Sequence, residues 1–164
     1  MDDGDLEATA YHEAGHAVMT VRLGGEVVSV TVDPDRDDGP RRTGDLTTRW
    51  RRAAPDRAAA VERDVLVALA GPVAEMHYTG EAFHPAAVAE WSADWATADA
   101  VSAAEFPERA KRTAYLERVT RELYAVFGQE RLWQAVAGVA DELLAHETLE
   151  DDEVRAVVEV WLRA

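Results

Sequence analysis

The sequence predicts a mainly helical α+β fold, in which helices accompany a small β-sheet. After Pro55, apolar residues recur at the three- and four-residue spacing of amphipathic helices. Before it, Val28, Val30 and Val32 alternate with polar residues, as in a half-buried strand. A chain of 164 residues can bury a hydrophobic core of its own, so we expect a single domain over residues 1–164.

The first expected helix runs from Leu6 to Leu23. Apolar residues recur along it at helical spacing, Asp5 is in place to cap its start, and Gly24 and Gly25 follow its end. The side away from the apolar stripe carries histidines and Met19 rather than a solvated polar face. We therefore expect both sides of this helix to be covered.

The segment Val28–Val32 is expected to pair with Thr43–Trp50 in a small sheet. Between them, Asp33–Pro40 spaces its carboxylates like a calcium-binding loop. Its glycine comes one place late, and Gly44 stands where the closing glutamate is needed, so we predict a solvated turn. The rest of the chain predicts helices with approximate ends: Arg57–Tyr78 with an interruption at Gly71–Pro72, Ala86–Glu105, Pro107–Phe127, Glu130–His146 and Glu150–Arg163.

The composition limits both the chemistry and the partners. The chain has no cysteine, which excludes disulfides, thiolate ligands and cysteine nucleophiles, so a metal must be held by His, Asp or Glu. A formal charge of −15 disfavours nucleic acid and anionic membranes. No apolar run approaches the roughly 20 residues of a membrane-spanning helix, and the acidic start is unlike a secretory signal. We expect a cytoplasmic protein with no membrane span and no nucleic-acid partner.

His12, Glu13 and His16 form the string His-Glu-Ala-Gly-His on the first expected helix. Residues four apart on a helix lie roughly 6 Å apart along its axis and about 40° apart around it, so two imidazoles can chelate one metal ion. Glu13 projects from the next position, where it can accept a proton from a zinc-bound water that attacks a carbonyl. The motif predicts a zinc metallopeptidase with Glu13 as the catalytic residue. Gly15 within this helix predicts close approach of another segment.

A catalytic zinc ion usually has three protein ligands and one open position. Spacing alone does not select the third ligand in this chain. Several residues stay open as candidates on chemical grounds: His77, His84, His146, Glu75, Glu90, Asp94 and Asp99.

Four separated segments carry a family resemblance: Thr9–Val18, Leu69–Glu75, Ser92–Ala98 and Glu147–Glu153. In this order they resemble segments of the peptidase domain of the FtsH family, the membrane-anchored ATP-dependent zinc metalloproteases. The resemblance implies a mainly helical fold with a small sheet beside the active-site helix. It also implies a peptide or unfolded protein as substrate, bound in extended form against a strand edge.

The same resemblance implies that Asp94, at the start of a helix that Ser92 would cap, completes the zinc site with His12 and His16. Asp99 and Glu90 are the alternatives to Asp94. The place of Glu75 in the second segment implies that it orients a ligating histidine. The expected cofactor is therefore Zn²⁺, bound by two imidazoles and one carboxylate.

The chain also departs from the family pattern. The 164 residues show no phosphate-binding glycine loop, and we expect neither a membrane anchor nor an ATPase domain, so processive degradation is expected to need a separate ATPase motor. The hexameric ring of the family, or another oligomer, is left open. Pro72 stands where the family more often has a basic residue.

Two other functions stay open beside the peptidase. One is a catalytically silent module that keeps the metal as a structural element or binds a partner, and the other is hydrolysis of a different amide. Glu13 favours an enzyme, because a structural metal has no use for an unliganded carboxylate beside it. Trp91 and Trp95 are interpreted as core residues, with a peptide-side-chain pocket as the alternative. A basic cluster is interpreted as a solvated patch rather than a contact for acidic peptides: Arg41, Arg42, Arg49, Arg51, Arg52 and Arg57.

Overall fold

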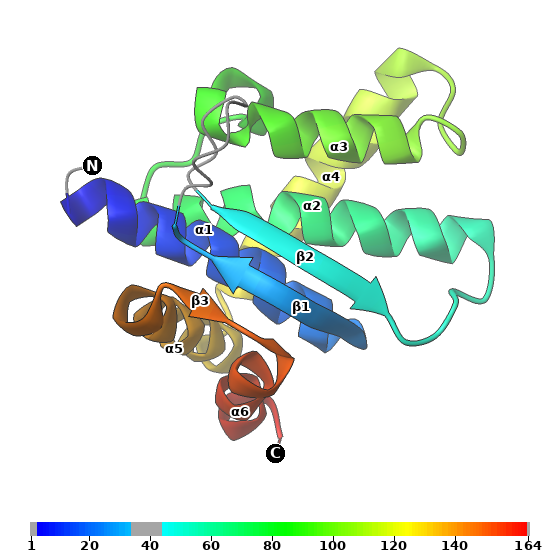
Figure 1. The fold of residues 1–164 in the computed structure, drawn as a ribbon. Coiled ribbons are helices and arrows are strands. Elements are labelled where there is room, and N and C mark those ends of the chain that lie inside the picture. Colours follow the sequence, from blue (N-terminus) through cyan, green and yellow to red (C-terminus); the bar gives the residue numbers. More distant parts are fainter. Residues whose placement is uncertain (1–2, 34–43, 164) are drawn as a thin grey trace.

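The computed structural model of the protein describes residues 3–33 and 44–163. Within these ranges, helices flank a small antiparallel sheet, which confirms the predicted mainly helical α+β class (Figure 1). In chain order the elements are α1 (Asp3–Arg22), β1 (Gly25–Thr31), β2 (Asp45–Trp50), α2 (Arg57–Thr79), the short 3-10 helices η1 (Pro85–Ala87) and η2 (Ala89–Trp91), α3 (Ser92–Ser102), α4 (Arg109–Phe127), α5 (Glu130–His146), β3 (Thr148–Leu149) and α6 (Asp151–Leu162).

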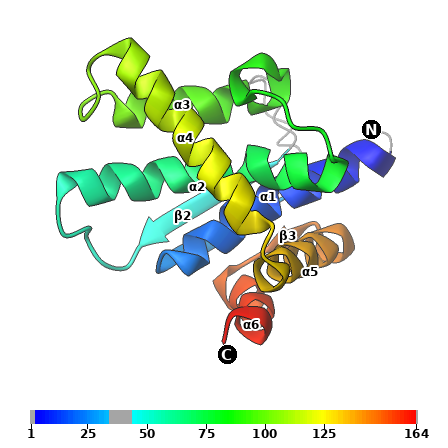
Figure 2. The same cartoon turned by 180° about the vertical axis from the view of Figure 1, so that it is seen from behind.

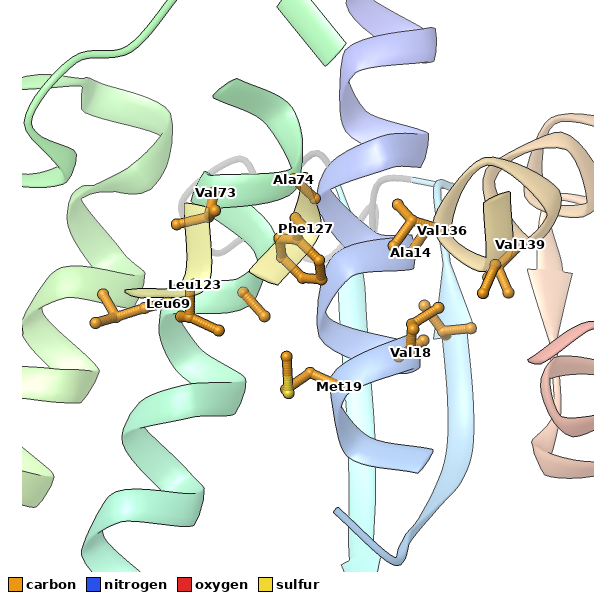
Figure 3. Close-up of a cluster of buried hydrophobic side chains, with 14 of the residues drawn as sticks. Ala14, Val18, Met19, Leu69, Val73, Ala74, Leu123, Phe127, Val136 and Val139 are labelled. Atoms are coloured by element: carbon orange, nitrogen blue, oxygen red, sulfur yellow. The ribbon is translucent and has the colours of Figure 1, made fainter. Parts of the chain in front are cut away.

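Helix α1 lies at the centre of the molecule, between α2 and α5 (Figure 1). Seen from behind, α4 crosses α2, while α6 packs on α5 (Figure 2). Their apolar faces meet in one core, to which α1, α2, α4 and α5 all contribute (Figure 3). Fully burying one large apolar side chain contributes about 1.5–3 kcal/mol, and the core contains Val18, Leu69, Leu123, Phe127 and Val136 at 2% exposure or less.

The sequence places α1 at the centre because its residues suit burial on both sides. Residues 9–20 are all buried or half-buried, as expected from the covered polar side. A Cβ built on Gly15 would lie 2.5 Å from the carbonyl oxygen of Ala70 and 2.6 Å from the Cβ of Ala74. The predicted close approach at Gly15 is therefore confirmed, and the approaching segment is α2.

The sheet has the strand order β2-β1-β3, with both pairs antiparallel. The expected pairing of the first two strands is confirmed, but β3 was not predicted because two residues leave no periodic pattern. The predicted alternation of buried and exposed side chains is wrong at Val28. A β-bulge between Val27 and Ser29 turns Val28 outward to 43% exposure, so Val27 is buried in its place, while Val30 and Val32 are buried as predicted.

Three helix predictions need correction. Helix α2 is not interrupted at Gly71–Pro72, although Pro72 removes one backbone donor, because most of its residues from Val61 to Met76 are buried in the core. The expected helix Ala86–Glu105 begins only at Ser92, after η1 and η2. Asp5 lies inside α1 instead of capping it, and its carbonyl accepts the hydroxyl of Thr9.

The predicted turn at Asp33–Pro40, and Arg41, Arg42 and Thr43, lie outside the described residues except for Asp33. Among the helices in the described part of the chain, none combines the length and apolar character needed to cross a membrane.

Candidate metal centre

The candidate centre is built from three helices. Helix α1 carries His12, Glu13 and His16, α2 runs alongside it, and the first turn of α3 carries Asp94. The two helix positions four apart bring the imidazoles of His12 and His16 into contact, with ring centroids 4.8 Å apart. Although Asp94 is more than 75 residues away in sequence, the packing of α3 on α2 brings it to the same place.

Three potential ligand atoms converge there. The Nε2 atoms of His12 and His16 are 3.1 Å apart. The Asp94 carboxylate reaches both rings, with Oδ2 at 3.0 Å from Nε2 of His12 and Oδ1 at 3.5 Å from Nε2 of His16. One donor atom from each residue lies within 4.8 Å of the others, which makes a group able to hold a metal ion.

The opposite ring nitrogens are already engaged. Nδ1 of His16 lies 2.7 Å from the carbonyl oxygen of Val67, and because a carbonyl only accepts, this nitrogen carries the proton. Nδ1 of His12 lies 2.9 Å from Oε2 of Glu75, where an ionised carboxylate fixes the same tautomer. In neutral rings, both Nε2 atoms then present lone pairs toward each other and toward Asp94, an arrangement that a proton or a metal ion between them would stabilise.

These distances fit a zinc ion. Ligand atoms around a tetrahedral zinc with bonds near 2.0–2.1 Å are separated by roughly 3.3 Å, and the three separations observed here are 3.1, 3.0 and 3.5 Å. Two imidazoles and one carboxylate also form the ligand set of many catalytic zinc sites. The structure brings together the three residues predicted as ligands, while their role in binding metal stays a prediction.

Without a metal, protonation supplies the missing positive charge. Burial alone would lower the pKa of His12, but hydrogen bonds to Asp94 and Glu75 outweigh it and raise the pKa to about 10. Burial likewise works against ionisation of Asp94, yet the neighbouring His16 and His12 hold its pKa well below its usual range. The site therefore favours a cation in both states, a proton on His12 or a metal ion.

Glu13 is buried next to this group, at 6% exposure. Burial raises the pKa of its carboxyl above the usual range, against the attraction of His16 and His12. A carboxyl with a raised pKa binds a proton more readily at neutral pH, which suits a general base that must hold the proton it accepts. Gly44, immediately before β2, lies directly against the end of this side chain.

Glu75 occupies the position expected of a residue that orients a ligating histidine, through its contact with His12. The sequence did not predict its second contact. The indole Nε1 of Trp91 donates to the same oxygen, Oε2, at 2.5 Å. Trp91 is buried as expected for a core residue, at 3% exposure, but its polar edge also holds Glu75 in place. In the sequence, a tryptophan next to the segment that contains Asp94 was the only sign of this Trp91–Glu75 hydrogen bond.

The other candidates for the third ligand lie outside the group, and most have other partners. His77 donates to the carbonyl of Tyr124, His84 pairs with Glu117, His146 with Glu142, and Asp99 with Arg112, while Glu90 is exposed on η2.

The predicted cap of α3 is wrong, because Ser92 is its first helical residue and donates to the carbonyl of Ala89. Trp95 packs against the core and also lines a pocket of about 160 Å³ with Phe83 and His84, so both interpretations of it stay open.

No protein-family model matches the chain, and no curated protein matches it significantly. The resemblance to the FtsH peptidase domain therefore rests on the four quoted segments, and the function must be argued from the geometry of the site.

Proposed function

We propose that this protein is a zinc-dependent metallopeptidase that hydrolyses peptide bonds in extended or unfolded polypeptides, related to the peptidase domain of the FtsH family. His12, His16 and Asp94 would hold the zinc ion, and Glu13 would be the catalytic base. The observation that carries this proposal is the convergence of three potential ligand atoms, Nε2 of His12, Nε2 of His16 and a carboxylate oxygen of Asp94, with the second nitrogen of each imidazole anchored elsewhere.

A bound zinc ion supplies a polarised carbonyl and a water whose pKa is lowered toward neutrality. The chain's own residues do the rest. Glu13 accepts the proton of the attacking water and can return it to the leaving amine. Glu75 and the carbonyl of Val67 keep both imidazoles in the tautomer that leaves Nε2 free. Trp91 keeps Glu75 directed at His12.

The sheet supports an extended substrate. On its far side from β2, strand β1 pairs with β3 at one end. At the other end Asp151 accepts from the backbone N–H of Val27, and Arg155 donates to the carbonyl of Gly25. Strand β2 is an edge strand among the described residues. An edge strand can hold a peptide by main-chain hydrogen bonds, which gives affinity with little sequence preference. The start of β2 lies beside Glu13, so such a peptide would pass close to the proposed base.

One observation favours the alternative of a catalytically silent metal-binding module. His16 and Glu13 are buried, at 7% and 6% exposure, and Asp94 is only partly exposed. A substrate therefore has limited access to the centre as it stands, whereas a structural metal needs none.

Glu13→Gln separates these functions. It keeps the size of the side chain and removes its basicity, so we expect wild type and variant to bind about one zinc ion each and only wild type to cleave a library of unfolded peptides. The rate should fall by about 10²–10⁴-fold in the variant. Glu142→Gln, on the surface of α5, is the matched control and should keep full activity. Equal inactivity of zinc-loaded wild type and Glu13→Gln would favour the silent module.

A further inference from the structure

Two glycines of the candidate metal centre contact functional side chains: Gly44 contacts the proposed base Glu13, and Gly71 contacts the proposed ligand His16. A Cβ built on Gly44 would overlap the carboxyl end of Glu13, at Oε1, Cδ and Cγ. A Cβ built on Gly71 would overlap the imidazole of His16, first at Nε2, the atom proposed to face the metal. One glycine precedes β2 and the other lies within α2, so the two contacts come from separate elements.

These contacts differ from those of the other crowded glycines. At Gly15 an added methyl group would first meet the backbone carbonyl oxygen of Ala70, at 2.5 Å. At Gly25 it would first meet side-chain carbons of Thr20 and Trp50, and at Gly138 a side-chain carbon of Val157, each at 2.7 Å. None of these atoms belongs to a proposed ligand or to the proposed base. At Gly44 and Gly71 the atoms met first are the ends of functional side chains. A methyl group there would displace the functional group before it displaced the fold.

The backbone at neither glycine can easily shift away from the side chain that it contacts. Residue 45 next to Gly44 is fixed by its pairing with Thr31 in the sheet. Gly71 lies in the buried middle of α2. The two side chains would lose contacts if they were displaced, since Glu13 is buried and Nδ1 of His16 lies 2.7 Å from the carbonyl oxygen of Val67.

We propose that Gly44 and Gly71 are positioning residues with separate effects: Gly44 sets the position of the Glu13 carboxylate, and Gly71 sets the position of the metal-facing edge of His16. The part of this inference that concerns catalysis rests on the proposed function. The part that concerns the two contacts does not.

The first test compares Gly44→Ala with Gly71→Ala. Gly71→Ala should weaken Zn²⁺ binding by about 10-fold or more, as for a displaced ligand. Gly44→Ala should bind Zn²⁺ like wild type but lower kcat for an unfolded peptide by about 10-fold or more, with KM unchanged, because the base acts in the transition state. Gly25→Ala, where the added methyl group would also meet neighbouring atoms below 3 Å but away from both groups, controls for a general loss of stability. Loss of zinc in Gly44→Ala, or unchanged zinc binding in Gly71→Ala, would overturn the division of roles.

The second test uses the metal-free protein and needs no activity. Urea unfolding is measured for Gly44→Ala, Glu13→Ala and the double variant, and for the corresponding set at Gly71 and His16. Glu13→Ala removes the atoms that the new methyl group would meet, so Gly44→Ala should lower the unfolding midpoint in wild type and not in the Glu13→Ala background. The same relief is expected for Gly71→Ala in the His16→Ala background.

Additive midpoint shifts in either set would overturn the proposal for that glycine. If the glycine variant alone does not fold, the double variant should fold again, and its failure to fold would overturn the proposal in the same way. If wild type binds zinc but cleaves no peptide, the proposed function fails, while these two cycles still decide whether the glycines position Glu13 and His16.

Discussion

Two charged clusters lie at opposite ends of the β1–β2 pair, and they differ in how their charges are balanced. The site cluster consists of His12, Glu13, His16, Glu75 and Asp94. The arginine cluster consists of Glu26, Arg49, Arg51, Asp151 and Arg155, and it joins the other end of the two strands to α6.

In the arginine cluster each carboxylate pairs with two arginines. Arg51 bridges Glu26 and Asp151 at 3.2 and 2.8 Å, and Arg155 approaches Asp151 at 2.6 Å. In the site cluster, none of the carboxylates pairs with an arginine or lysine within residues 3–33 and 44–163. Among the described residues, the positive charge closest to these carboxylates is a proton on His12 or His16. The arginine cluster therefore has the pairing of a structural joint, whereas the site cluster has a group of ligand atoms that could hold a cation.

The largest expected effect comes from removing one carboxylate from each cluster. Asp94→Ala should weaken Zn²⁺ binding by more than about 100-fold, because loss of a ligand costs more than the 10- to 100-fold cost of losing a partner of a ligand. Asp151→Ala should leave zinc affinity unchanged. Titration against a competing chelator measures both. Equal affinities in wild type and Asp94→Ala would move the third ligand elsewhere.

The second prediction concerns the alkaline stability of the metal-free protein. The pKa of His12 rises to about 10 in the folded chain from 6.5, so its protonation stabilises the fold fully below 6.5, and this contribution is lost as the pH rises through about 10. Between pH 7 and pH 9 the free energy of unfolding should fall by about 1.4 kcal/mol per pH unit from this group. Urea unfolding in the presence of a chelator measures the slope.

Two controls belong to this experiment. The zinc-bound protein should lack the contribution, because its His12 is neutral at all these pH values. His12→Gln should flatten the slope in the metal-free protein. A slope that is the same in wild type and His12→Gln would contradict the assigned proton.

A smaller effect is expected from the contacts behind the ligands. Glu75→Gln keeps the shape of the side chain but weakens the hydrogen bond to Nδ1 of His12, so zinc affinity should fall by about 10-fold. Trp91→Phe removes the indole donor to Glu75 and should have a still smaller effect in the same direction. The same chelator titration measures both. A larger loss for Trp91→Phe than for Glu75→Gln would mean that Trp91 acts through packing instead.

The sequence predicted the site better than its surroundings, and the reason is the range of the interactions. The proximity of His12 and His16 follows from helical spacing alone. The choice of Asp94 as the third ligand required the family resemblance, because no local pattern links residues so far apart in the sequence. The role of Trp91, the contact of Gly44 with Glu13 and that of Gly71 with His16 depend on how separate elements pack. None of them leaves a periodic signal.

The fold shows the same division. Long amphipathic helices such as α4 and α5 were predicted within two residues at each end, because their pattern repeats over several turns. The errors fall where tertiary packing overrides local preference. Buried neighbours keep α2 helical through Pro72, and a bulge turns Val28 away from the face that alternation assigns to it.

The smallest expected effect concerns the contribution of the arginine cluster to stability at acidic pH. Partial burial opposes ionisation of Asp151, but hydrogen bonds from Arg155 and from the N–H of Val27 outweigh it, so its pKa is lowered from 3.8. A lowered pKa contributes stability that is present above the unfolded value and is lost as the pH falls through the folded value. In the metal-free protein, Asp151→Asn should therefore show a weaker loss of stability below about pH 4 than wild type, by less than about 1 kcal/mol because the group is partly solvated.

Urea unfolding at a series of acidic pH values measures this difference. Asp152→Asn is the matched control, because the carboxylate of Asp152, next in sequence to Asp151, makes no ion pair among the described residues. Its free energy of unfolding should change with pH as that of wild type does. If Asp151→Asn also follows wild type, the arginine cluster makes no net contribution to stability through this carboxylate. The contrast between a joint whose carboxylates pair with arginines and a proposed cation site would then rest on the zinc-binding measurements alone.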